Sequence, residues 1–218
     1  MRDDLEKIRD DYDRLAEQYT NHIADELRHK PLDRELLDRF LRQVQGLGPA
    51  CDMGCGPGHV ARYLHEGGLE VFGLDLSPGM IEQARKLNPD IRFESGDMLN
   101  LDLSDDSLAG IVAFYAIVNL NRDLHPRVFQ EMFRVLRPGG TLLLSFHVGT
   151  ETVQPPELWE VKISMSFYFF EPGEIRASLE HSGFTVQDII EREPYPEVEY
   201  PSRRAYTFAT KPEPFAKS

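Results

Sequence analysis

The segment from Ala50 to Leu64, ACDMGCGPGHVARYL, constrains the fold of this chain more than any other. A short apolar run ends at Asp52, a helix-forming stretch begins near His59, and three glycines lie between them at alternate positions: Gly54, Gly56 and Gly58. This order predicts a strand, a tight glycine turn and a helix N-terminus, an arrangement in which a ligand can approach bare backbone. We therefore expect a ligand site at this turn.

Apolar strands and amphipathic helices alternate after the turn. Strands are predicted near Ala50–Met53, Glu70–Gly73, Ile91–Glu94, Ile111–Phe114 and Thr141–Phe146, with helices near His59–Glu66, Pro78–Leu87 and Pro126–Leu136. Strands joined by helices need crossover connections, so the pattern predicts an α/β fold with a doubly wound, mostly parallel sheet. The last two strands, near Thr185–Glu191 and Ala205–Lys211, have no helix between them and are expected to form an antiparallel edge.

Two segments fall outside this alternation. Residues 1–48 are predicted to be a helical N-terminal appendage, because apolar side chains recur at spacings of three and four. Residues 148–170 carry two adjacent prolines and a dense aromatic group, and we expect them to cover a substrate. The aromatic residues are Trp159, Phe167, Tyr168, Phe169 and Phe170; core packing is the alternative for Phe167 and Phe169. With 218 residues, the chain is expected to form a single domain, 1–218.

The charge and the cysteine content narrow the possible partners. A formal net charge of -13 opposes binding to a polyphosphate backbone, so no nucleic-acid partner is expected. No apolar run reaches the length of a membrane helix or a signal peptide, which favours a cytoplasmic protein without a membrane partner. Cys51 and Cys55 are expected to be reduced. Together with His59 they do not make a full zinc ligand set, so no metal is expected.

An acidic residue at the end of the second strand points to a nucleoside ligand. Asp75 lies about 20 residues beyond the glycine turn, the distance at which a carboxylate can accept hydrogen bonds from ribose hydroxyls. The alternative is that Asp75 only caps the next helix. The dinucleotide fingerprint is broken, since His59 stands where its last glycine should be, and no phosphate-loop lysine follows the glycines.

These residues resemble the motifs of class I S-adenosylmethionine-dependent methyltransferases. The resemblance begins with Asp52-Met-Gly54-Cys-Gly56-Pro-Gly58 and continues through GLDLSPGMIEQAR, ESGDML and RVLRPGGTLLLSFH. It covers roughly residues 10 to 147 and only loosely the last third of the chain. It implies a Rossmann-like seven-stranded sheet with N-terminal helices, S-adenosyl-L-methionine as cofactor and S-adenosyl-L-homocysteine as product.

The resemblance also implies roles for particular residues. Asp52, Gly54, Cys55 and Gly56 would hold the methionine end of the cofactor, and Asp75 its ribose. Leu76 and Met80 would pack on the adenine, Asp97 would bind its amino group with Met98 beside it, and Phe114 would pass close to the sulfonium. Tyr12 and Tyr19 would close over the cofactor, or alternatively pack the helix on the domain. Lys30 would either reach the cofactor carboxylate or remain solvated.

Three residues are candidates for the catalytic step. Ligands of such sheets lie at the carboxyl ends of the strands, which places Tyr115, Asn119 and His147 near the transferred methyl group. His147 is the best general base by residue type, and the alternative is a histidine that only shapes the pocket. Asn119 stands where related sequences tend to have a histidine, which weakens the case for a base at that position.

The sequence therefore predicts a methyltransferase that acts on an oxygen or nitrogen atom of a small molecule, as a monomer or homodimer. The aromatic content of residues 148–170 favours a small acceptor over a polymer. Two alternatives remain. One is transfer of a different group, such as aminopropyl, from a nucleoside sulfonium, and the other is a catalytically silent cofactor-binding or partner protein.

Overall fold

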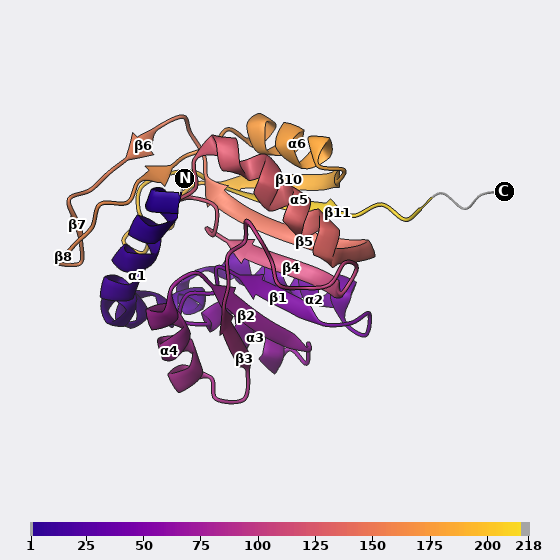
Figure 1. The fold of residues 1–218 in the computed structure, drawn as a ribbon, viewed down its shortest axis with the longest axis horizontal. Helices are drawn as coiled ribbons and strands as arrows, with labels where there is room; N and C mark the ends of the chain where they lie inside the picture. Colours follow the sequence, from indigo (N-terminus) through magenta and orange to yellow (C-terminus); the bar gives the residue numbers. More distant parts are fainter. Residues whose placement is uncertain (1, 215–218) are drawn as a thin grey trace.

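A twisted seven-stranded sheet forms the centre of the molecule (Figure 1). The computed structural model describes residues 2–214. The strands lie in the order β10-β11-β5-β4-β1-β2-β3. Their bounds are β1 (Ala50–Met53), β2 (Val71–Asp75), β3 (Arg92–Ser95), β4 (Leu108–Phe114), β5 (Leu136–His147), β10 (Thr185–Arg192) and β11 (Arg204–Thr210). Strands β1 to β5 pair in parallel, and β11 runs antiparallel to both β5 and β10. The predicted fold class is confirmed.

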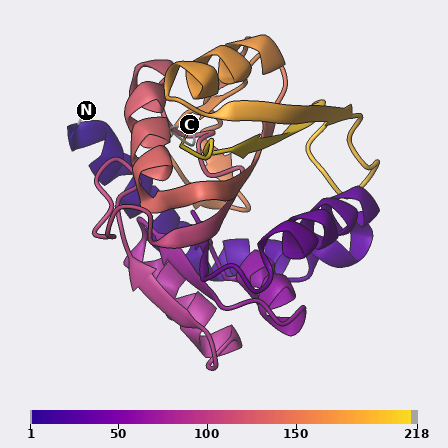
Figure 2. The ribbon, with the colours of Figure 1, turned by 90° about the vertical axis from the view of Figure 1, so that its right-hand side faces the viewer.

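Helices cover both faces of this sheet (Figure 2). On one face, α5 (His125–Val135) and α6 (Pro172–His181) bury side chains against alternate residues of β1, β4 and β5. On the other face lie α2 (Pro31–Val44), α3 (His59–Glu66) and α4 (Pro78–Leu87). Strand residues alternate between the two clusters, as the two-residue period of a strand requires: Cys51 and Met53 face α5, whereas Ala50 faces α2 and α3.

Local sequence explains where the helices begin. Ser77 caps α4, since its hydroxyl accepts a hydrogen bond from the Met80 amide, and Pro78 occupies the first helical position as predicted. Strand β5 starts earlier than predicted, at Leu136 instead of Thr141. Residues 137–140, Arg-Pro-Gly-Gly, form an irregular bulge within this strand, between the pairs Leu108–Leu136 and Gly110–Thr141, with Gly139 at φ +75°.

The N-terminal helix and residues 148–170 both lie at the edge of the sheet where the parallel strands end (Figure 1). Helix α1 (Arg2–Ile23) is followed by a 3-10 turn, η1 (Glu26–His29). Residues 148–170 form two small ribbons, in which β6 (Thr152–Val153) pairs with β9 (Phe167–Tyr168) and β7 (Glu157–Leu158) pairs with β8 (Val161–Lys162). The β7–β8 turn consists of Trp159 and Glu160, both at positive φ (+47° and +66°). This turn conformation usually needs glycine or asparagine, so other contacts must hold it.

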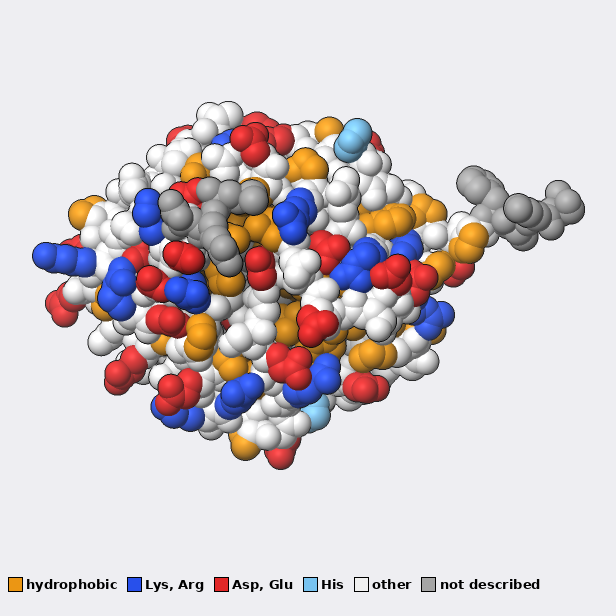
Figure 3. Space-filling view, viewed as in Figure 1, with side chains coloured by type: hydrophobic (Ala, Val, Ile, Leu, Met, Phe, Trp, Pro, Cys, Tyr) orange, Lys and Arg blue, Asp and Glu red, His pale blue; other side chains and the backbone are white. Residues whose placement is uncertain are grey.

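The outer surface carries charges of both signs. On the face shown in Figure 3, lysine and arginine side chains are scattered among acidic ones. Within residues 2–214, none of the helices combines the length and the apolar character needed to cross a membrane.

Candidate functional site

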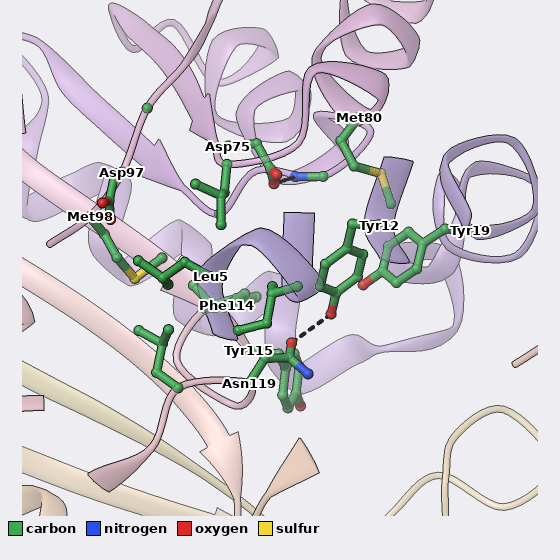
Figure 4. Close-up of a pocket in the computed structure, with 17 residues that line it drawn as sticks. Leu5, Tyr12, Tyr19, Asp75, Met80, Asp97, Met98, Phe114, Tyr115 and Asn119 are labelled. Carbon is green, nitrogen blue, oxygen red and sulfur yellow. Dashed lines mark hydrogen bonds between the residues drawn. The ribbon is translucent and has the colours of Figure 1, made fainter. Parts of the chain in front are cut away.

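A cavity of about 80 Å³ opens where β1, β2 and β4 end, with α1 as its opposite wall (Figure 4). Tyr115 and Asn119 line it, together with ten of the twelve residues predicted for the cofactor: Tyr12, Tyr19, Gly54, Gly56, Asp75, Leu76, Met80, Asp97, Met98 and Phe114. The other two, Asp52 and Cys55, border an adjoining recess that shares Gly54 and Gly56 with the cavity. The structure thus brings together residues spread over more than 100 positions of sequence.

The glycine turn has the backbone geometry that its sequence requires. Gly54, Gly56 and Gly58 have φ values of +72°, +50° and +80°, in the left-handed region that residues with a side chain rarely adopt. A Cβ atom on Gly54 would lie 2.6 Å from the Cβ of Ala116, and one on Gly56 would lie 3.6 Å from Cε1 of Tyr19. Side chains at these positions would fill the cradle between the turn and α1, so glycine keeps it open.

Asp75 holds the turn and faces the cavity at the same time. One carboxylate oxygen accepts the Gly56 amide at 2.8 Å, and the other accepts the Ser77 amide at 2.9 Å. Ser77, not Asp75, caps α4, so the capping alternative is wrong. Burial raises the pKa of Asp75, although the backbone hydrogen bonds act against this shift. Across the cavity, Asp97 accepts the Leu99 amide at 2.8 Å.

Asp52 and Cys55 are more deeply buried than Gly54 and Gly56. Asp52 accepts the Ala61 amide at 2.9 Å and so holds the first turn of α3, while burial raises its pKa to about 7. The sulfur of Cys55 points into the core, where a Cβ on Gly73 would lie 2.8 Å from it. Cys55 can therefore meet a ligand through its backbone only.

Asn119 connects α1 with residues 148–170. Its Oδ1 accepts the Tyr12 hydroxyl at 2.7 Å (Figure 4), and its Nδ2 donates to the Ser166 carbonyl at 2.9 Å. The Tyr12 ring meets the Tyr19 ring edge to face, at 5.8 Å between centroids. An amide with both ends engaged is a structural link and has no basic lone pair, so these contacts argue for a positioning role.

His147 lies apart from the cofactor cavity, in a second cavity of about 220 Å³ that shares Tyr12, Tyr19 and Tyr115 with the first. Its Nδ1 is 2.8 Å from the Ser202 hydroxyl, and its ring lies between those of Tyr115 and Phe169. Burial lowers its pKa to about 3, and the charges of Arg204 and Lys30 add to this effect. The imidazole is therefore neutral at pH 7 and weakly basic.

Lys30 is buried, so the prediction of a solvated lysine is wrong. Its side chain is 5% exposed, and its ammonium lies 2.7 Å from Glu26 Oε2 and 3.2 Å from Glu199 Oε1. Sequence reasoning missed Glu199 and Arg204, which line the second cavity. They lie about 170 residues from Lys30, and nothing local in the sequence signals the contact.

Residues 148–170 divide between the second cavity and the core. Trp159 and Phe167 line the cavity, whereas Phe170 is fully buried in the main core and Phe169 stacks on His147. Among residues 2–214, no three side chains of histidine, cysteine, aspartate or glutamate come together as a possible metal site. Cys51 and Cys55 are both free thiols.

Known proteins share parts of this sequence. A family model described as "Methyltransferase domain" matches residues 50–140. The malonyl-[acyl-carrier protein] O-methyltransferase of Pectobacterium atrosepticum is 31% identical over 109 residues, 50% of this chain and 42% of that protein. The demethylmenaquinone methyltransferase of Renibacterium salmoninarum is 32% identical over 94 residues, 43% of this chain and 39% of that protein. The chain thus spans about half or less of the length of these curated relatives.

Solved structures share the fold over most of the chain. An S-adenosylmethionine-dependent methyltransferase from Methanosarcina mazei superposes with a TM-score of 0.73 at 17% identity, covering 82% of this chain and 98% of that one. One from Mesorhizobium loti gives 0.63 at 24% identity, covering 81% and 96%. At these identities the likeness establishes the fold alone.

The sheet order and the superposed structures show that the chain has the fold of class I S-adenosylmethionine-dependent methyltransferases. Within this fold, residues 50–140 are the part that matches the methyltransferase-domain model.

Proposed function

We propose that this protein transfers a methyl group from S-adenosylmethionine to an oxygen or nitrogen atom of a small molecule. The observation that carries the proposal is that the cavity beside the glycine turn adjoins a second cavity, and that Tyr12, Tyr19 and Tyr115 line both. A donor and an acceptor in adjoining cavities would meet at these tyrosines. Holding two reactants in line provides much of the rate acceleration in reactions of this kind.

The residues of the first cavity fit the cofactor. The cradle at Gly54 and Gly56 would admit the cofactor against backbone, Asp75 would offer carboxylate lone pairs to its ribose hydroxyls, and Asp97 would accept a hydrogen bond from its adenine amino group. Leu76, Met80, Met98 and Phe114 supply apolar walls. When bound, the cofactor would supply the methyl group of its sulfonium and leave as S-adenosylhomocysteine, and the acceptor would give up its proton to the solvent outside the cover.

The residues of this chain would contribute mainly by aligning the two reactants and excluding water, and less by acting as a general base. With its pKa lowered to about 3, His147 would take up a proton only weakly at pH 7. Tyr115 keeps its proton, since burial raises its pKa to about 12, and its hydroxyl lies 3.4 Å from that of Tyr206. We infer that His147 shapes the acceptor cavity and that Tyr115 orients the acceptor.

Residues 148–170 are proposed to cover the acceptor within a single domain, 1–218. Asp11 of α1 is fully buried and accepts hydrogen bonds from the Ser164 and Met165 amides, both at 2.7 Å. Asn119 provides the second link between the same two parts of the chain. A cover tied down at two points would keep water out of the space between the cavities.

Titration calorimetry of the purified protein with S-adenosylmethionine and S-adenosylhomocysteine tests the cofactor part. We expect both to bind, and Asp75→Asn to weaken binding about 10- to 100-fold, because hydrogen bonds to a charged group contribute about 1.5–3 kcal/mol. Asp102→Asn, at an exposed acid in the loop before β4, is the matched control and should change nothing. Absence of binding to the unmodified chain would contradict the proposal.

The transfer itself is tested with methyl-labelled cofactor and a metabolite extract. Methyl transfer leaves S-adenosylhomocysteine and a labelled product, whereas transfer of an aminopropyl group leaves methylthioadenosine. Tight cofactor binding without any labelled product would favour a silent cofactor-binding protein.

A further inference from the structure

The second cavity has one aromatic end and one charged end. Tyr19, Trp159 and Phe167 form part of its aromatic wall. Trp159 is held by a stack on His22, with 4.4 Å between ring centroids and 9° between planes, and by an edge contact with Tyr19 at 5.6 Å. These contacts hold the strained β7–β8 turn described above. Backbone strain of this kind is maintained at binding sites more often than elsewhere.

At the charged end Glu199 lies among three cations, one of which, Arg192, also pairs with Asp33 at 2.9 Å. The side chain of Glu199 is 1% exposed. Arg192 donates to both of its oxygens, at 2.6 and 2.8 Å, and the Lys30 ammonium and Arg204 Nε each lie 3.2 Å from Oε1. Glu26, the other acid that lines the cavity, is shared between Lys30 and His59.

Arg204 is the cation best placed to receive a ligand. It is 3% exposed, and its Nη1 donates to the carbonyls of Tyr200 and Ser202. Its Nε, although close to Glu199, is a buried donor that makes no hydrogen bond to any residue within 2–214. A buried donor without a hydrogen bond is costly, and a ligand oxygen would remove that cost.

Among the charged side chains that act on the His147 ring, the cations Arg204 and Lys30 oppose a further positive charge. Burial is the first cause of the lowered pKa of His147, and the charges of Arg204 and Lys30 follow, each outweighing the opposing charge of Glu199. A cationic amine would meet the same opposition at this end of the cavity. A carboxylate would be stabilised there.

We propose that the second cavity binds a small aromatic carboxylic acid as the methyl acceptor, with its carboxylate at Arg204 and Lys30 and its ring against Trp159 and Phe167. The proposal rests on the function proposed above and names the class of acceptor. The end of such a ring away from the carboxylate would have to reach Tyr12 and Tyr19, which line both cavities. A ring substituent there, such as a hydroxyl, is the group that would receive the methyl.

The test is titration calorimetry of the full chain saturated with S-adenosylhomocysteine. The probes are 4-hydroxybenzoate and 4-hydroxybenzamide, which share the ring and differ in charge. We expect the acid to bind about tenfold or more tightly than the amide, as a charge-assisted hydrogen bond would give. Arg204→Met should reduce the affinity for the acid to that for the amide, and Arg204→Lys should restore part of it. Lys86→Met, an exposed lysine of α4, is the control and should have no effect.

A second variant covers the case in which Arg204→Met fails to fold. Trp159→Ala removes part of the wall without changing charge, so it should weaken both probes by a similar factor while S-adenosylhomocysteine still binds. The inference is overturned if the unmodified chain binds acid and amide equally or binds neither, or if Trp159→Ala changes nothing. If S-adenosylhomocysteine itself fails to bind, the proposed function is what has failed.

Discussion

Removing the Asp11 carboxylate should loosen residues 148–170 from α1 without unfolding the sheet. Asp11 is buried, contacts Arg14, and accepts three hydrogen bonds: the amides of Ser164 and Met165, both at 2.7 Å, and the Ser164 hydroxyl at 3.2 Å. In Asp11→Ala these donors lose their partner. The Met165 amide lies in a buried stretch, whereas Ser164 is exposed and can bind water instead.

The magnitude follows from these contacts. A hydrogen bond to a charged acceptor contributes about 1.5–3 kcal/mol, so the two amides together give an upper range of about 3–6 kcal/mol. Rehydration of Ser164 lowers the local loss to about 2–4 kcal/mol. Since about 1.4 kcal/mol corresponds to a factor of ten, local opening should become roughly 30- to 700-fold more frequent.

Amide hydrogen exchange followed by mass spectrometry measures this opening directly. We expect faster exchange at Ser164 and Met165 in Asp11→Ala. The matched control is Asp13→Ala on the same helix, because Asp13 accepts the Ser77 hydroxyl at 2.5 Å and the Gly79 amide at 2.8 Å, and so anchors α1 to α4 instead. Equal exchange at Ser164 and Met165 in the original chain and in Asp11→Ala, or the same increase in both variants, would refute the reasoning.

Two further predictions concern stability. Burial lowers the pKa of His125 to about 4, so the unfolded state binds the proton between pH 6.5 and 4 and stability falls as the pH drops through that range. Lowering the pH from 7 to 5 should therefore reduce the unfolding free energy of the original chain by about 2 kcal/mol more than that of His125→Phe. Denaturant titrations at both pH values would check this. Gly54→Ala should lower the unfolding free energy by about 2–5 kcal/mol, because φ is left-handed and the new Cβ would lie 2.6 Å from that of Ala116. The control is Gly46→Ala, with φ +78° and nothing within 4 Å, which should lose about 1–2 kcal/mol. Equal losses of stability in thermal unfolding would count against the clash.

Local patterns predicted the fold because each element here obeys its own sequence rules. The glycine spacing fixed the turn after β1, and Ser77 followed by Pro78 fixed the start of α4. The antiparallel edge followed from the missing helix between β10 and β11. The start of β5 was misplaced because Gly139 and Gly140 suggest a turn before Thr141, whereas Leu136 already pairs with Leu108 of β4 ahead of this irregular stretch.

The cofactor cavity was predictable to a greater extent than the acceptor cavity. Strand ends and a glycine turn are short-range features, and they place Asp75 and Gly54 together whatever the rest of the chain does. The cluster of Lys30, Glu199 and Arg204 depends on how the start of α2 meets the loop between β10 and β11. The local sequence around Lys30 predicts a solvated side chain, because Glu199, one of the two acids that pair with it, is distant in sequence.

The stack of Trp159 on His22 provides an optical signal. The chain contains one tryptophan, and it lies where the β7–β8 turn rests on α1. In the absence of an acceptor, its fluorescence emission should therefore report the separation or contact of these two parts without any attached dye. Stopped-flow mixing with cofactor would then yield the rate of that movement from the unmodified protein.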